Sequence, residues 1–260
     1  MIADYLGLLL ADGRLPVGAH TQSAGVEPAF QAGLALEQLP AYLEVRLRTV
    51  TEVEAATAVV ARHAWLAGSQ GSPTGSGHGT ARPAPATRFE PVVGQRLAAA
   101  PTMRSESVEG RRVQRLVEID RGWRARTASD AIRDASDLLG RGYLRLGARL
   151  WDLGALAART WCRPVVLGVM AAEARLDPAQ TARLVGFEDV QTAIAAALKL
   201  RPFDPALGAA WSMAAARPVE DMVARVAGLT DPDDIPAYAA PQLEHWAQLH
   251  KTSGRRLFRA

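Results

Sequence analysis

The sequence predicts an all-α fold, a single-domain helical bundle of roughly eight to ten helices. Ala, Leu, Arg and Glu recur at three- and four-residue spacings along most of the 260 residues, which is the period of an amphipathic helix. β-Branched residues rarely alternate with polar ones, so strand patterns are weak. Short connections between successive helical patterns favour a bundle.

The composition is that of a globular protein. Hydrophobic residues make up 48% of the chain and charged residues 22%, so we expect one domain over residues 1–260 with a substantial core. No apolar run approaches the roughly 20 residues of a membrane span, and the opening MIADYLGLLL lacks the basic flank of a signal peptide. A cytoplasmic location and no membrane partner are therefore expected.

The first distinctive stretch, LPVGAHTQSAGVEPAF, lies a dozen residues into the chain. Pro16 and Gly18 favour a turn, and Thr21 or Ser23 is expected to cap the following helix. Glu27 would lie near the positive end of that helix dipole. By residue type alone, the stretch is either a structured helix entry or an active site.

The next pattern predicts one long helix over residues 36–67. Pro40 can occupy a first helical turn, and Leu43 and Val50 follow on one apolar side. Glycines then end the helix. The Gly-, Ser- and Pro-rich stretch at about 68–86 is expected to be a flexible loop, because it cannot bury enough apolar surface to offset its ordering entropy.

A helical pattern returns over residues 109–126 and continues after the sequence TASD to Trp151. Thr127, with Asp130 three residues later, resembles a capping box. Further helices are predicted to begin at Pro164, Asp177, Asp204 and Pro218, and a last one covers 240–251. Asp177 and Asp204 each precede a proline and are expected to be N-caps.

Three glycines interrupt the helix that ends near Trp151, namely Gly140, Gly142 and Gly147. An interior glycine costs roughly 1 kcal/mol relative to alanine, so something must compensate. Close approach of a neighbouring helix is the expected reason. A phosphate-binding loop is the alternative, but no strand precedes the segment and no Gly-Lys-Ser/Thr follows it.

The sequence contains no recognisable pattern of catalytic or metal-binding residues. The HExxH, GxSxG, Walker and Rossmann patterns are absent, so no catalytic residue and no metal site are predicted. His20 has no acidic residue or cysteine at a useful spacing. His245 and His250 are five residues apart, off a common helical face, and are expected to be surface or half-buried imidazoles. The sole cysteine, Cys162, is interpreted as a buried, inert thiol.

The balance of charge leaves a second class of function open. The formal net charge is +3 and the sequence pI is near 9.4, with an arginine-rich ending, SGRRLFRA. A helical nucleic-acid-binding regulator is therefore the alternative function. The lack of a clear helix-turn-helix with a basic recognition helix argues against it, so no nucleic-acid partner is expected.

Three stretches, in order along the chain, resemble signature segments of the urease accessory protein UreF family. The N-terminal stretch matches the form LPxG followed by S-x-G-[LV]-E. The segment IRDASDLLGRGYLRL matches E/R-x-A-S-x-x-x-G-R-x-L-L, and HKTSGRRLFRA aligns with an ending of the type H-E-T-x-x-S-R-L-F-x-S. The motif or interface positions that this resemblance implies are Pro16, Gly18, His20, Ser23, Gly25, Glu27, Ser136, Gly140, Arg141, Leu200 and Pro202.

Some positions depart from the family pattern. Lys251 stands where the family usually has Glu, and Ala260 replaces a terminal Ser. In KLRPFDP, Asp204 and Pro205 replace a Gly-Gln pair. Residues 68–104 look like an insertion.

The resemblance implies an all-α, non-catalytic urease maturation factor that forms a homodimer. It would bind UreD (UreH in some organisms) and recruit the GTPase UreG, so that nickel reaches the urease apoprotein. Nickel and GTP would be handled by these partners, and no cofactor would be bound directly. Leu257 and Phe258, flanked by arginines, have the composition of an interface anchor that gains structure by docking. The implied partner-binding residues are His250, Thr252, Arg255, Arg256, Leu257, Phe258 and Arg259.

Overall fold

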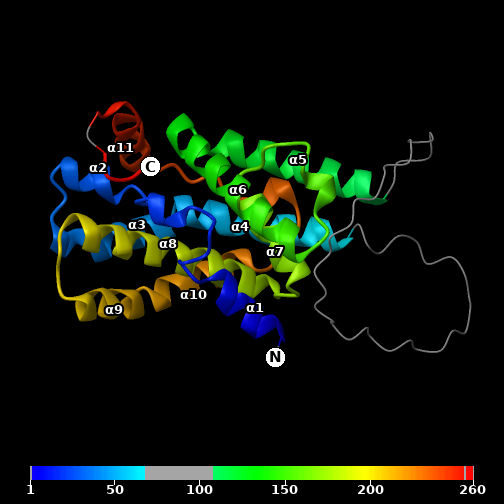
Figure 1. Cartoon of the computed structure of the whole chain (residues 1–260), viewed down its shortest axis with the longest axis horizontal. Helices are drawn as coiled ribbons and strands as arrows, with labels where there is room; N and C mark the ends of the chain where they lie inside the picture. The colour runs from blue at the N-terminus through cyan, green and yellow to red at the C-terminus, as the bar shows by residue number, and fades with distance from the viewer. Residues whose placement is uncertain (1, 68–107, 255, 260) are drawn as a thin grey trace, which may run out of the picture.

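The computed structural model describes residues 2–67, 108–254 and 256–259, which form α-helices joined by short 3-10 turns and contain no β-strand (Figure 1). This confirms the all-α prediction. The predicted loop at 68–86, the whole 68–104 insertion, Arg255 and Ala260 lie outside the described residues. The helices are α1 Ile2–Leu10, α2 Val26–Gln31, α3 Leu39–Leu47, α4 Val50–Ala67, α5 Val108–Arg126, α6 Asp130–Leu150, α7 Arg163–Glu173, α8 Pro178–Leu200, α9 Pro205–Ala214, α10 Ala216–Val226 and α11 Pro241–Thr252.

Helix α4 lies at the centre of the bundle. It packs against α7, α8 and α5, and nearly every side chain from Thr51 to Ala61 is buried. Helices α5 and α6 cover one side, and α8 with α9 and α10 covers the other (Figure 1). Helix α11 lies over α2 and α6 at one end, so the C-terminus returns to the N-terminal third of the chain.

The single helix predicted over residues 36–67 is wrong, because the chain forms α3 and α4 with a break at Arg48 and Thr49. The Thr49 hydroxyl donates to the Val45 carbonyl over 2.7 Å, and the Thr49 N–H donates to Arg46 three residues back. Such local bonding by threonine competes with the regular ladder and bends or ends a helix.

Helix capping follows the sequence in part. Asp177 forms the predicted cap of α8, including a reciprocal capping box with Gln180. The Thr127 capping box is wrong: its hydroxyl donates to the Trp123 carbonyl, and Ser129 caps α6 by accepting from the Ile132 N–H. Ser129 wins because it immediately precedes the helix in extended backbone.

The starts of α9 and α10 lie at or near the predicted residues. Asp204 caps α9 by accepting from the Ala206 N–H. Helix α10 begins at Ala216, two residues before the predicted Pro218, so the proline lies inside its first turn, where its missing N–H costs no helical hydrogen bond.

The glycines of α6 do mark close approach. A Cβ on Gly140 would lie 2.1 Å from the Trp161 carbonyl oxygen, and one on Gly142 would lie 2.1 Å from the Val17 carbonyl oxygen. Both neighbours are non-helical backbone and not the expected helix. These segments pack against α6 so closely that a side chain on either glycine would overlap them.

No helix in the described part of the chain has the length and apolar character that a membrane span requires. The apolar core is one continuous cluster that includes Trp123, Trp161, Tyr143 and Leu167.

Candidate docking site where the N-terminal motif meets the C-terminal tail

The N-terminal motif folds as two left-handed glycines on either side of a 3-10 turn. Gly18 has φ +91° and Gly25 has φ +75°, values that favour glycine. A Cβ on Gly25 would lie 2.7 Å from the Tyr42 hydroxyl, which itself donates to the Ala24 carbonyl over 2.6 Å. A Cβ on Gly18 would have no neighbour within 4 Å, so the left-handed backbone conformation, and not close approach, requires glycine there.

The expected cap of α2 by Thr21 or Ser23 is wrong. Gly25 is the N-cap residue and supplies no side-chain hydrogen bond. The Thr21 hydroxyl donates to the Gly18 carbonyl, and Ser23 is fully buried with its hydroxyl lacking a partner in the described structure. The tight turns of this motif place both hydroxyls away from the first turn of α2.

Glu27, in the first turn of α2, holds the C-terminal segment. Its buried carboxylate accepts the N–H of Leu257 over 2.7 Å and the N–H of Phe258 over 2.8 Å. The Nε2 atom of His250 lies 3.0 Å from Glu27 Oε2. A further backbone hydrogen bond joins the Arg259 N–H to the Thr21 carbonyl. The N-terminal and C-terminal motifs therefore form one structural unit.

His250 was expected at the surface or half-buried, and the structure corrects this. Its side chain is 2% exposed, because α11 packs on α2 and places the imidazole against Glu27. His245, on the same helix, is exposed. Only the tertiary contact distinguishes the two histidines.

The tail divides into an inward and an outward part. Phe258 is 5% exposed, and the ammonium group of Lys199 lies 5.5 Å from the centre of its ring. Leu257 is 65% exposed, and Arg256 and Arg259 are exposed beside it. The predicted anchor is thus one buried aromatic ring and one outward aliphatic side chain.

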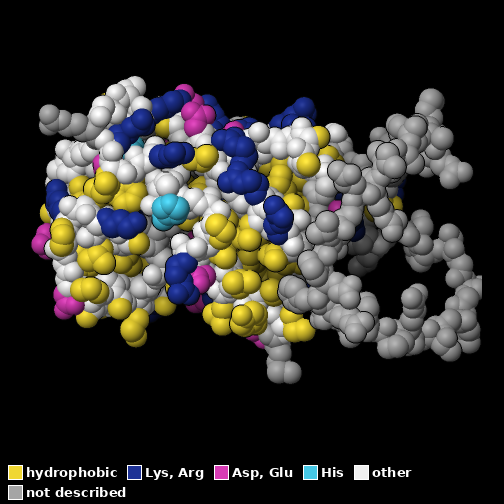
Figure 2. Space-filling view, viewed as in Figure 1, with side chains coloured by type: hydrophobic (Ala, Val, Ile, Leu, Met, Phe, Trp, Pro, Cys, Tyr) yellow, Lys and Arg dark blue, Asp and Glu magenta, His cyan; other side chains and the backbone are white. Residues whose placement is uncertain are grey.

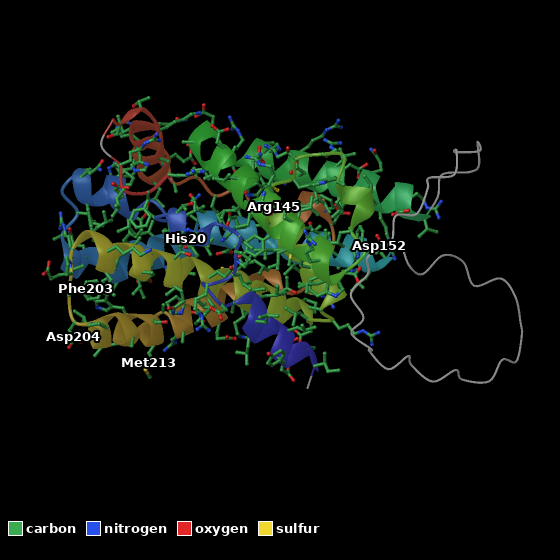
Figure 3. All side chains as sticks on the ribbon, in the orientation of Figure 1. His20, Arg145, Asp152, Phe203, Asp204 and Met213 are labelled. Atoms are coloured by element: carbon green, nitrogen blue, oxygen red, sulfur yellow. The ribbon has the colours of Figure 1, made fainter. Side chains whose placement is uncertain are left out.

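The remaining residues of the predicted partner set and motif set lie in different surroundings. Ser136 is buried and accepts the Arg163 N–H over 2.9 Å. Leu200 is half-buried where α8 ends, near Arg201, whose guanidinium lies over the Phe30 ring of α2 at 4.3 Å. The exposed positions are Pro16, His20, Arg141, Pro202 and Thr252. Figure 3 shows His20 and Arg145 on one face, and Phe203 with Asp204 at the end of the bundle where α8 meets α9.

A cavity of about 450 Å³ adjoins the N-terminal motif and the tail. Buried ionic groups line its inner part. Arg46 donates from Nε to Asp189 over 2.9 Å, and the Thr51 hydroxyl donates to the same carboxylate. Arg163 pairs with Glu54 in the same way.

A neighbouring hydrogen bond runs from the Tyr143 hydroxyl to Glu188. None of these inner groups was predicted, although charged residues within the otherwise apolar helix TEVEAATAVV were a usable signal.

Burial and pairing act in opposite directions on these groups. Burial alone would raise the pKa of Asp189, but attraction and hydrogen bonding by Arg46 outweigh it, so the pKa lies below its usual value. Burial raises the pKa of Glu188 and raises that of Tyr42 to about 12. Burial also raises the pKa of the Cys162 thiol, which is free and buried as predicted.

Within the described residues, no cluster of His, Cys, Asp or Glu side chains could hold a metal ion.

The fold and this site define an all-α protein with an organised edge at which its N-terminal motif meets the C-terminal tail. The UreF family model matches residues 35–216. The chain is 34% identical over 256 residues to a urease accessory protein UreF of Mycobacterium sp. (strain JLS), covering 96% of each chain. It is 31% identical over 257 residues to the urease accessory protein UreF of Mycobacterium marinum, again with 96% of each covered. The chain therefore belongs to the UreF family of urease accessory proteins, as its motifs predict.

Proposed function

We propose that this chain is a non-catalytic scaffold of urease maturation. It binds UreD/UreH, recruits the GTPase UreG and so promotes nickel insertion into the urease apoprotein, while nickel and GTP are handled by those partners. It acts as a homodimer. Membership of the urease accessory family supports the general role.

The single observation that supports the specific role is the set of hydrogen bonds between Glu27 and the tail. Two backbone N–H groups and one imidazole converge on the buried Glu27 carboxylate. These contacts fix the position of a short terminal segment. Hydrogen bonds to a charged group are worth about 1.5–3 kcal/mol each. The result is a preorganised surface, and preorganisation lowers the entropic cost of association.

The outward part of this surface has the composition of an interface hot spot. Leu257 projects with 65% of its surface exposed, and Arg256 and Arg259 lie beside it. Exposed aliphatic side chains with adjacent arginines are suited to a partner that is apolar at its centre and acidic around it.

Co-expression with UreD/UreH and UreG, followed by size-exclusion chromatography, tests the proposal. We expect wild type to elute with both partners in one complex. Leu257→Ala should lower the recovered partner severalfold without loss of helical circular dichroism. Leu150→Ala, which truncates a 44% exposed leucine at the far end of α6, is the matched control. If wild type elutes without either partner, the proposal is wrong.

A further inference from the structure

The cavity beside the tail is lined by elements that the sequence places far apart. The turn before α2 and α2 itself form one wall, α6 forms the opposite wall, and α11 with the tail forms the mouth. Ile132, Leu139 and Leu243 give its sides an apolar surface. A volume near 450 Å³ falls in the range of sites that hold a ligand or an inserted side chain.

A buried donor in this cavity lacks an acceptor. Gln22 is 6% exposed and lines the cavity, and its Nε2 atom has no hydrogen-bond partner among the described residues. Leaving such a group unpaired costs about 1–3 kcal/mol. An occupant that offers an oxygen atom to Gln22 would remove this cost.

The mouth of the cavity carries unbalanced positive charge. Three of the lining cations, Arg46, Arg163 and Lys251, form ion pairs with carboxylates. Arg256 and Arg259 also line the cavity, and neither forms an ion pair in the described structure. In Figure 2, Lys and Arg side chains gather over α6 and the C-terminal segment on the face shown. The mouth therefore favours an anionic group.

We propose that this cavity is a socket for a segment of UreD/UreH that inserts a large apolar side chain and places a neighbouring carboxylate against Gln22, Arg256 and Arg259. The inference rests on the proposed function and names the chemistry of the partner segment. Apolar walls, an unpaired buried donor and two guanidinium groups without a carboxylate partner among the described residues all match that segment. The socket is also continuous with exposed Leu257, so one partner surface covers both.

Filling the socket tests its role directly. Ala135 is half-buried on the α6 wall, so Ala135→Phe places a ring inside the cavity. Ala148→Phe puts the same ring on an exposed position of α6 outside the cavity and is the matched control. We expect Ala135→Phe to weaken binding of purified UreD/UreH about 30-fold or more, the effect of losing one hot spot. Ala148→Phe should bind as wild type does.

Charge reversal at the mouth provides a second test that leaves the apolar walls of the cavity unchanged. Arg256→Glu/Arg259→Glu should weaken UreD/UreH binding and reduce its dependence on salt. Arg149→Glu/Arg217→Glu makes the same change in net charge at exposed positions away from the socket and should bind as wild type does. Equal losses in both double variants would show a general charge effect and overturn the socket.

A photo-crosslinking residue in place of Leu139, on the apolar wall, identifies the occupant. Recovery of a UreD/UreH peptide in which a large apolar residue lies beside Asp or Glu supports the proposal. Crosslinking to a second copy of this chain instead overturns it. If Ala135→Phe binds UreD/UreH as tightly as wild type, the socket is wrong while the scaffold function stands. If wild type itself does not bind UreD/UreH, the proposed function fails.

Discussion

The carboxylate of Glu27 accepts the backbone N–H of Phe258 over 2.8 Å, although the two residues are 231 positions apart. The same carboxylate also accepts the N–H of Leu257. One acidic side chain in the first turn of α2 thus fixes the direction of the C-terminal segment.

Removal of this carboxylate should release the tail. In Glu27→Ala, the amides of Leu257 and Phe258 lose charge-assisted hydrogen bonds, and about 3 kcal/mol of tail docking should be lost. Their hydrogen exchange should then accelerate roughly 100-fold. Mass spectrometry of the C-terminal peptide measures this. Glu37→Ala, at an exposed position, is the control, and unchanged exchange in Glu27→Ala would contradict the assigned role.

The two neighbouring apolar residues of the tail should have separable effects. Phe258→Ala removes a buried ring and should cost about 3–5 kcal/mol of docking free energy, which exposes the tail to limited proteolysis. Leu257→Ala truncates an exposed side chain, so proteolysis should not change while partner capture falls. If both variants are equally sensitive to protease, the division into inward and outward parts is wrong.

The Arg46–Asp189 ion pair in the inner part of the cavity should be important for folding stability. Asp189→Asn leaves the Arg46 guanidinium, buried between α3 and α8, without its countercharge, so the free energy of unfolding should fall by about 3–5 kcal/mol. Urea unfolding measures the loss. Glu220→Gln breaks an exposed pair with Arg183 and should cost less than about 1 kcal/mol. Comparable losses in the two variants would contradict the buried assignment.

The close contact at Gly142 should not tolerate a methyl group. In Gly142→Ala, the Cβ would overlap the Val17 carbonyl, so we expect destabilisation of about 1–3 kcal/mol. Gly228→Ala meets nothing within 4 Å and has no positive φ, so thermal unfolding should show little change. A wild-type melting temperature in Gly142→Ala would show that α6 and the N-terminal turn are not packed this closely.

Glu188 should give a pH dependence of known sign. Burial raises its folded-state pKa above 4.5. The contribution of the protonated carboxyl to folding stability is therefore fully present below pH 4.5 and is lost as the pH rises through the folded-state pKa. Glu188→Gln lacks this loss and should gain stability relative to wild type as the pH rises from 4.5. Urea unfolding across that range measures the difference.

Glu220→Gln provides a control of opposite sign for that measurement, because a hydrogen bond from Arg183 lowers the pKa of Glu220. Its exposure makes the expected change smaller. A difference between Glu188→Gln and wild type that does not vary with pH would contradict the assigned burial of Glu188.

Local features of this fold could be predicted because their causes lie close in sequence. The cap at Asp177 depends on a residue three positions away, and the glycines of α6 signal a close neighbour by their energetic cost. The apolar period does not predict the break at Thr49, although its cause is local, because the competing hydroxyl bond leaves that period almost unchanged.

The site was only partly predictable for a different reason. Residue types and motifs selected Glu27 and Phe258, but their pairing depends on how α11 returns to α2. The Arg46–Asp189 pair joins residues 143 positions apart, and no short-range pattern connects them. Tertiary packing therefore decides which polar residues are buried and paired.

The nickel content of urease most directly tests the claim that the N-terminal motif and the C-terminal tail together form the docking surface for urease maturation. Urease would be purified from cells in which wild type, Glu27→Ala or Glu37→Ala is the sole copy of this protein. We predict severalfold less nickel per urease with Glu27→Ala and a wild-type content with Glu37→Ala. Full nickel occupancy with Glu27→Ala, at equal protein levels, would contradict this claim.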